Sequence, residues 1–278
     1  MRGVSARAQL PILSTILLKA SKEGVVLSAT DLELSFRVKV RAKVSEEGEI
    51  AVPAKLFSDL VATLPVGVVD LSDKKQTLII EGEKVRAEVV GQSSEEFPAL
   101  PKTKGKGLEI DVAELVEKVE RVGIAAAKDD ARPILAGVLW IFDKKRITLA
   151  ATDGYRLGVD YFKNDAAETV GDTQKFVLPV RALMELTRVL EPAMKTVKVE
   201  FDNDKQQVIF QADDIEMSSR LIAGEFPPYT KVIPTEKKIT VVIDKEALME
   251  AVKRASLFAR DSANVVKLAV SEGEVKVT

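Results

Sequence analysis

The chain has 278 residues, of which 46% are hydrophobic, and it contains no histidine and no cysteine. This composition excludes a Ser-His-Asp triad, a cysteine nucleophile, zinc fingers, iron–sulfur ligation and disulfide bonds. The formal net charge is −2, so a polyanionic partner would have to be bound by a local basic surface. Because domains usually contain about 100 to 200 residues, the length predicts two domains and part of a third.

The first apolar run, Leu10 to Leu18, is interrupted by Ser14 and Thr15 and is too short to span a bilayer. With Arg2 and Arg7 upstream it is similar to a secretory signal, but no small-x-small cleavage site follows it. We therefore expect a cytoplasmic protein without a membrane helix.

Four amphipathic helices are predicted, each preceded by proline or aspartate and carrying apolar residues near offsets of four, eight and eleven. Aspartate suits an N-cap because its carboxylate accepts free backbone N–H groups, and proline suits the first turn, where no N–H is needed. The helices follow Pro53, Asp111, Pro179 and Asp244, and their apolar positions are Phe57, Val61 and Leu64; Leu115, Val119 and Val122; Leu183, Leu186 and Leu190; and Leu248, Val252 and Ala255.

Short alternating segments between these helices predict antiparallel strands, and the fold class is therefore α+β. The clearest strands are 34–40, 77–80, 146–150, 207–211 and 217–222, with 265–270 and 274–278 near the C-terminus. Polar clusters predict loops at 164–173 and 202–204, and stretches rich in proline and lysine predict domain linkers at 98–107 and 227–238.

An internal repeat organises these elements. Pro11-Ile12-Leu13 recurs as Pro133-Ile134-Leu135, and Ala29-Thr30-Asp31 recurs as Ala151-Thr152-Asp153, both after 122 residues. Glu96-Phe97-Pro98 recurs as Glu225-Phe226-Pro227 after 129 residues, which predicts small insertions in the second copy. A repeat of this size is one domain, and we expect the first copy to lack its opening helix and a third copy to stop early.

Two pairs of carboxylates are candidate metal ligands of a nuclease, namely Asp31 with Asp153 and the adjacent Asp129 with Asp130. A catalytic carboxylate rarely needs a copy in each repeat, whereas Thr-Asp commonly caps a turn between strands. We therefore favour capping and solvated roles, and expect no bound metal. A carboxylate-dependent metal nuclease and a protein-interaction scaffold without a role on DNA remain the alternatives.

The sequence contains neither the P-loop motif nor the dinucleotide-binding GxGxxG motif, so no nucleotide site and no cofactor are expected. The four helical segments 53–64, 112–128, 180–195 and 245–260 together carry a charge of +3, which leaves −5 elsewhere. A repeated helical face with this bias fits a polyanion that is held loosely and without sequence readout.

Six motifs resemble, in order, those of one protein family, the β sliding clamps of bacterial DNA polymerase III. They are Arg7 with Leu10-Pro11-Ile12-Leu13, Ala29-Thr30-Asp31-Leu32-Glu33, Val52-Pro53-Ala54-Lys55, Arg132-Pro133-Ile134-Leu135-Ala136-Gly137-Val138, Ala151-Thr152-Asp153-Gly154-Tyr155-Arg156-Leu157 and Gly224-Glu225-Phe226-Pro227. The resemblance covers essentially the whole chain and implies a DNA clamp fold. It implies clamp domain 1 at 1–102, domain 2 at 103–234 and the first part of domain 3 at 235–278.

The same resemblance implies a noncatalytic, head-to-tail homodimeric ring around double-stranded DNA, with helices lining the hole. Arg7 and Arg132 match DNA-contacting or channel-facing positions of the family, and the supporting helix cations are Lys55, Arg181, Lys253 and Arg254. The dimer interface would be formed by Ala87 and Val89 on one side and Leu257 and Phe258 on the other.

The resemblance also implies an apolar groove that takes short linear peptides from the replicative polymerase, the clamp loader and repair proteins. Its matching positions are Leu135, Thr152, Gly154, Tyr155, Arg156, Leu157, Pro227, Lys231 and Val232. The family's remaining groove wall would follow Thr278, which predicts reduced peptide affinity. Tyr155 and Lys231 depart from the family pattern, and small Ala87 offers less apolar area for a dimer contact.

Overall fold

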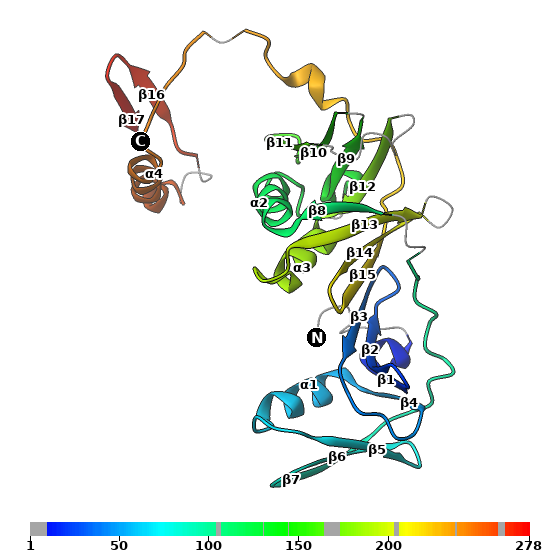
Figure 1. The fold of residues 1–278 in the computed structure, drawn as a ribbon. Coiled ribbons are helices and arrows are strands. Elements are labelled where there is room, and N and C mark those ends of the chain that lie inside the picture. The colour runs from blue at the N-terminus through cyan, green and yellow to red at the C-terminus, as the bar shows by residue number, and fades with distance from the viewer. Residues whose placement is uncertain are drawn as a thin grey trace. The chain divides into compact units, whose positions relative to one another are not determined.

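The computed structural model describes residues 10–103, 107–129, 131–143, 145–163, 173–202, 206–236, 238–260 and 265–278. Arg7 and Asp130, both singled out from the sequence, lie outside these ranges. The chain divides into two compact units, Met1–Pro227 and Pro228–Thr278 (Figure 1). Each unit is described by itself.

The first unit contains most of the secondary structure. In chain order its elements are η1 (Pro11–Ser14), β1 (Thr15–Ser21), β2 (Gly24–Thr30), β3 (Leu34–Val40), β4 (Gly48–Pro53), α1 (Ala54–Thr63), β5 (Asp70–Lys74), β6 (Thr77–Gly82), β7 (Val85–Val90), β8 (Leu108–Asp111), α2 (Val112–Gly123), η2 (Pro133–Ala136), β9 (Gly137–Phe142), β10 (Arg146–Thr152), β11 (Leu157–Lys163), β12 (Gln174–Pro179), α3 (Val180–Val189), β13 (Thr196–Asp202), β14 (Gln207–Ala212) and β15 (Ile215–Arg220). The η elements are single turns of 3-10 helix.

The second unit consists of η3 (Tyr229–Val232), α4 (Lys245–Ala259), β16 (Leu268–Ser271) and β17 (Glu274–Val277). The two strands form an antiparallel hairpin, and α4 contacts β17. Across the parts of both units that the structure describes, no helix has the length and apolar character needed to cross a membrane.

The repeat inferred from the sequence is confirmed by the element order. The series η1, β1 to β4, α1 and β5 to β7 recurs as η2, β9 to β12, α3 and β13 to β15. The offset is 122 residues between the ends of β2 and β10, 126 between the ends of β4 and β12, and 130 between the starts of β7 and β15. The second copy is therefore longer between β11 and β12 and between β13 and β14, close to where loops were predicted.

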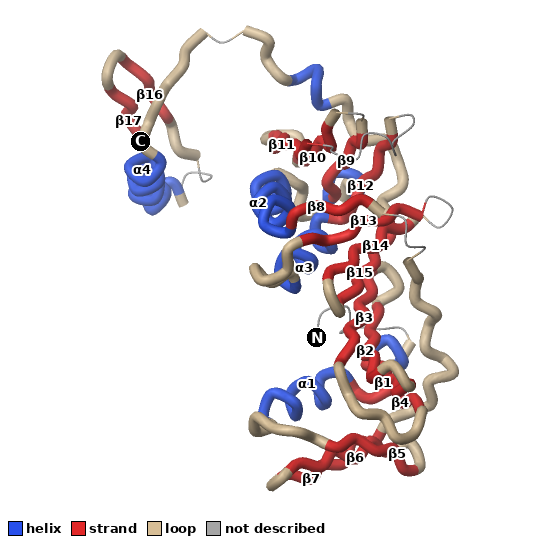
Figure 2. The backbone as a smooth tube through the Cα atoms, in the orientation of Figure 1, coloured by secondary structure: helices blue, strands red, loops and turns tan. Residues whose placement is uncertain are grey.

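One antiparallel sheet runs through both repeats, in the strand order β4-β1-β2-β3-β15-β14-β13-β8. Its centre is a seam between β3 of the first repeat and β15 of the second, paired from Leu34 opposite Ser219 to Val38 opposite Ile215. Two further sheets have the orders β11-β10-β9-β12 and β5-β6-β7. Figure 2 shows α1, α2 and α3 on the same side of the continuous sheet.

Side chains from the first repeat complete the core of the second. Leu34 and Phe36 of β3 belong to the same buried cluster as Trp140, Phe210 and Met217 of the second repeat. The smaller core of the first repeat lies between α1 and its sheets and is formed by Leu18, Ile50, Val52, Phe57, Leu78, Ile80 and Val89. The seam is therefore a packed interface and holds the two repeats together through both backbone pairing and burial of apolar surface.

All four predicted helices are present. Asp111 accepts a hydrogen bond from the backbone N–H of Glu114 (2.9 Å), and Asp244 accepts one from Ala247 (2.8 Å), so both aspartates cap their helices as predicted. One apolar position was wrong: Val61 is 46% exposed, because the face of α1 that meets the core carries Ala54, Phe57 and Leu60, with Leu64 directly after the helix. The strand predicted at 217–222 is β15 and begins two residues earlier.

Replacing Asp111 with alanine is expected to lower the free energy of unfolding by about 1 kcal/mol, because the first turn of α2 loses its side-chain acceptor. Urea denaturation followed by circular dichroism measures this change. Asp59→Ala, an exposed substitution inside α1, is the control and should change stability by less than about 0.5 kcal/mol. Equal effects of the two substitutions would contradict the capping role.

Candidate DNA-facing helices and peptide-binding turn

The turn between β10 and β11 is held in one shape by its own side chains. The Asp153 carboxylate accepts the backbone N–H groups of Tyr155 (2.9 Å) and Arg156 (3.0 Å) and also the Arg156 Nε (3.0 Å). The Thr152 hydroxyl accepts the Gly154 N–H (3.0 Å) and donates to the Arg156 carbonyl (2.7 Å). The backbone N–H bonds from Tyr155 and Arg156 to the Asp153 carboxylate keep the pKa of Asp153 below its ordinary value. The turn therefore presents Tyr155, which is 97% exposed, from a rigid base.

The equivalent turn of the first repeat is built in the same way. Asp31 accepts the backbone N–H groups of Glu33 (3.1 Å) and Leu34 (2.7 Å), and Thr30 accepts that of Leu32 (3.0 Å). Leu32 has a φ of 76° where Gly154 has a φ of 94°, so both turns use the left-handed region at the same position. The prediction that these Thr-Asp pairs cap turns is confirmed.

Asp129, like Asp31 and Asp153, shapes a turn. Asp129 accepts the backbone N–H of Ala131 (3.1 Å), which is again a local capping bond. Within the described ranges, no group of three or more acidic side chains is arranged to hold a metal ion. The three described candidate ligands of the nuclease alternative, Asp31, Asp129 and Asp153, thus each shape a separate turn.

A hollow of about 240 Å³ lies beside the β10–β11 turn. Its lining residues are Ala126, Ala127, Lys128, Asp129, Arg132, Asp153, Tyr155 and Arg156. The Arg132 guanidinium donates to the Asp153 carbonyl (3.0 Å) and would lie 3.3 Å from a Cβ atom at Gly154. Arg132, matched to the DNA-contacting positions by resemblance, therefore also supports this turn, a role that the sequence did not reveal.

The other residues predicted for the peptide groove have different environments. Leu135 is 6% exposed, so its side chain is part of the packed interior, whereas Thr152 and Leu157 are half-buried beside the turn. Pro227 is exposed at the end of the first unit. Lys231 and Val232 belong to η3 of the second unit and are exposed there.

Four of the cations predicted to face DNA lie on helices α1, α3 and α4, and all four side chains are exposed. Arg181 of α3 contacts the Asp31 carboxylate of the first repeat (3.4 Å), and Arg254 of α4 contacts Glu250 (3.3 Å). Lys55 of α1 and Lys253 of α4 form no ion pair with any described residue. The Arg254–Glu250 pair is exposed on both sides and is worth less than about 1 kcal/mol, so Arg254 can exchange its carboxylate for a phosphate, whereas the Asp31 side chain that contacts Arg181 is only 10% exposed.

The predicted dimer contacts need one correction. Val89 is 2% exposed and packs in the core of the first repeat, so its side chain is not available to a partner. Ala87 is half-buried on the same strand, β7, which is the edge strand of its sheet. The outward side chains there are Arg86, Glu88 and Val90, because strand residues alternate between faces. In the second unit, Leu257 and Phe258 are exposed on α4.

The seam contains an ion pair that is largely removed from water, between Arg37 of β3 and Glu216 of β15. Burial raises the pKa of Glu216 above its ordinary value, although Arg37 opposes the shift. An acid with a raised pKa destabilises the folded state as the pH rises through that pKa.

We therefore expect the contribution of Glu216 to the free energy of unfolding to decrease as the pH rises above the ordinary pKa of a glutamate, and we expect Glu216→Gln to remove this decrease. The neutral amide cannot ionise, so the variant lacks this group's contribution. Chemical denaturation as the pH is raised from the ordinary range of a glutamate, with Glu81→Gln, a substitution of an exposed residue on β6, as the control, measures the difference. A pH profile that Glu216→Gln leaves unchanged would contradict the assignment.

The chain matches three family models. They describe the DNA polymerase III beta subunit and match as its N-terminal domain over residues 1–101, its central domain over 109–228 and its C-terminal domain over 230–278. The beta sliding clamp of Bacillus subtilis is 30% identical over 285 residues, covering 99% of this chain and 74% of the relative. That of Staphylococcus aureus is 28% identical over 290 residues, covering 100% of this chain and 75% of the relative.

Solved structures of the same kind share the fold. A DNA polymerase sliding clamp from Bacillus subtilis has a TM-score of 0.90 at 28% identity, covering 99% of this chain and 74% of that chain. A sliding clamp from Pseudomonas aeruginosa bound to griselimycin has a TM-score of 0.89 at 26% identity, with the same coverage.

The repeated α+β domains, the sheet shared between them and the helices on one side define a DNA clamp. The chain belongs to the bacterial DNA polymerase III beta subunit family, the beta sliding clamps. Its function is that of a DNA sliding clamp, a noncatalytic processivity factor, which rejects the nuclease alternative.

Proposed function

We propose that the chain forms part of a closed ring around double-stranded DNA and tethers the replicative polymerase to its template. The observation that carries this proposal is the seam: one sheet continues from the first repeat into the second while α1, α2 and α3 stay on one side of it. Repeating that junction around a circle gives an outer wall of sheets and an inner lining of helices. We propose the domain limits 1–102, 103–234 and 235–278 within this arrangement.

The proposed DNA contacts are Lys55, Arg181, Lys253 and Arg254, together with Arg7 and Arg132. Contacts between such side chains and phosphates carry no sequence information, and water-mediated contacts allow the ring to move along the duplex. Their attraction is screened by salt, so it does not hold the ring at one place. Retention would then come from closure of the ring.

We propose that the β10–β11 turn forms one side of a groove for short linear peptides of the polymerase, the clamp loader and repair proteins. The rigid base of the turn and the close approach allowed by Gly154 support this role, since little ordering is needed when a peptide binds. Leu135, Thr152, Tyr155, Arg156, Leu157, Pro227, Lys231 and Val232 are the remaining proposed groove residues. The griselimycin complex of the Pseudomonas aeruginosa clamp shows that a related protein binds a ligand.

We further propose that β7 is one side of a head-to-tail dimer contact and that α4 of a second copy, with Leu257 and Phe258, is the other. The seam supports this proposal because it shows how an edge strand of one repeat joins an edge strand of the next. Ala87 and the backbone at Val89 would contribute from β7. As a factor of bacterial DNA replication, the protein is proposed to act in the cytoplasm.

Retention on circular DNA tests the encirclement. The protein is incubated with nicked circular plasmid and passed through a gel-filtration column, and the DNA fractions are assayed for protein. We expect protein to elute with the circle and to be lost when a restriction enzyme linearises the plasmid, since only an encircling ring can leave at an end. Equal retention on both forms would overturn encirclement, and no binding to either would favour the protein-interaction scaffold.

A further inference from the structure

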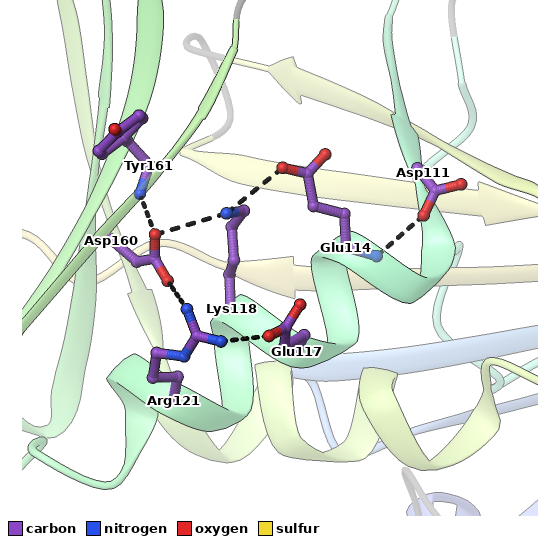
Figure 3. A network of polar contacts seen from close by, with 7 residues as sticks. All are labelled: Asp111, Glu114, Glu117, Lys118, Arg121, Asp160 and Tyr161. Atoms are coloured by element: carbon purple, nitrogen blue, oxygen red, sulfur yellow. Dashed lines mark hydrogen bonds and ion pairs between the residues drawn. The ribbon is translucent and has the colours of Figure 1, made fainter. Parts of the chain in front are cut away.

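Two cations of α2 are held by a carboxylate from the neighbouring sheet (Figure 3). Asp160 of β11 lies between Lys118, at 3.4 Å, and Arg121, at 2.7 Å. Asp160 also accepts the backbone N–H of Tyr161 (2.8 Å), which fixes the position of its carboxylate. A strand residue thus reaches across to the helix and binds both of its central cations.

Each cation has a second acidic partner one helical turn away on α2. Lys118 contacts Glu114 (3.3 Å), and Arg121 contacts Glu117. The five side chains of this cluster, Glu114, Glu117, Lys118, Arg121 and Asp160, together carry a charge of −1 at neutral pH. The centre of α2 therefore opposes the approach of phosphate, although it contains two cations.

The acids of the cluster differ in how firmly they are held. Glu114 and Glu117 are exposed i,i+4 partners, and pairs of this kind contribute only about 0.3 to 0.5 kcal/mol, so a phosphate can replace them. The side chain of Asp160 is only 13% exposed and is anchored by the Tyr161 N–H as well as by both cations. Asp160 is therefore the member that DNA cannot displace easily.

The contacts of Asp160 with a backbone N–H and two cations favour the ionised form of its carboxyl. Burial alone would raise the pKa of this carboxyl, but the Tyr161 N–H, Lys118 and Arg121 together bring the pKa below its ordinary value. Asp160 is consequently ionised at neutral pH and holds a full negative charge beside the helix.

We propose that Asp160 weakens the hold of this clamp on DNA by retaining Lys118 and Arg121 on the protein. This inference rests on the proposed function, in which the helices face the duplex. The matching position in the first repeat, Val38 on β3, has no charge. Retention of the two cations by Asp160 would favour sliding, because fewer phosphates are neutralised at any one time.

The test is the salt dependence of binding to a short DNA duplex, measured by fluorescence anisotropy with the full chain and its Asp160→Asn variant. Each additional phosphate contact steepens the slope of log K against log salt by about 0.9. A contact of this kind changes the affinity by about 3-fold when the salt concentration changes fourfold. We expect the variant to bind about 3- to 10-fold more tightly at low salt and to have a slope steeper by about 1. The asparagine can still accept the Tyr161 N–H, which preserves the strand.

Glu49→Gln is the matched control. Glu49 of β4 binds Lys19 of β1 at 2.8 Å, and Lys19 lies on the opposite face of its sheet from the core residue Leu18 that packs with α1. This substitution also removes one acid and releases one cation, but away from the helices, so we expect no change in slope. An equal gain from Glu49→Gln would overturn the proposal, because it would show an effect of net charge alone.

A second pair of variants keeps the test decisive if Asp160→Asn is poorly folded, which thermal unfolding would reveal. Arg121→Gln alone should change DNA affinity by less than about twofold, because its charge is already neutralised. Lys55→Gln should weaken binding by about 3-fold or more, because Lys55 is exposed on α1 and forms no ion pair with any described residue. A large loss from Arg121→Gln would overturn the proposal. Failure of the unaltered chain to bind DNA would count against the proposed function itself, and unchanged affinity of a folded Asp160→Asn variant would count only against this inference.

Discussion

Replacing Phe36 with alanine is expected to lower the free energy of unfolding by about 3 to 5 kcal/mol and to separate the unfolding of the two repeats. Phe36 comes from β3 of the first repeat but is 7% exposed inside the core of the second, where Met217 is its partner across the seam. Truncation therefore leaves a cavity in one domain and removes the side chain that links it to the other.

The single tryptophan makes this result measurable. Trp140 is buried in the core of the second repeat, so its fluorescence follows that repeat, whereas far-ultraviolet circular dichroism follows the whole chain. In the Phe36→Ala variant we expect the two signals to give different urea midpoints. Phe57→Ala, in the core of the first repeat, is the control: it should destabilise its own repeat without opening the seam. The same separation of midpoints in both variants would show that Phe36 has no special linking role.

Replacing Lys55, Arg181, Lys253 and Arg254 together with glutamine is expected to weaken binding to a short duplex on the order of 100-fold near 0.1 M salt. All four side chains are exposed on helices, and each proposed phosphate contact contributes about 0.9 to the slope of log K against log salt. The slope should therefore decrease by up to about 3.6. Fluorescence anisotropy over a series of salt concentrations gives both quantities.

Four lysines outside the helices serve as the control, because their replacement by glutamine changes the net charge by the same amount. They are exposed on strands and turns of the first repeat, at Lys19, Lys22, Lys39 and Lys84. If binding depended only on net charge, this variant would lose affinity to the same extent. If the helices face DNA as proposed, the four-lysine control variant should keep most of the slope of log K against log salt that the unaltered chain shows.

Features set by neighbouring residues could be predicted from the sequence. The capping aspartates Asp111 and Asp244, the apolar spacing of α2 and the Thr-Asp turns all depend on contacts within four residues or one helical turn. The repeat could also be recognised because three short motifs kept nearly the same spacing. The family motifs then placed the groove and DNA-facing residues, and those assignments stay predictions.

Features that depend on distant contacts could not be predicted. The seam pairs Ser35 with Ser218, which are 183 positions apart, and no local pattern indicates which two strand edges meet. The burial of Val89 depends on which face of β7 meets the core, and a shift of one residue would have exposed it. The contact of Arg132 with the Asp153 carbonyl joins two segments that only the folded sheet brings together.

The seam also has a mechanical consequence. Strands of a sheet are linked one after another through their hydrogen bonds, so a pull across the strands loads every strand pair in series, and the weakest pair separates first. Between β3 and β15 that load is shared by backbone bonds, the Ser35–Ser218 hydroxyl contact, the Arg37–Glu216 pair and the buried side chain of Phe36. Under tension the two repeats should therefore stay joined at the seam and move together as one rigid segment.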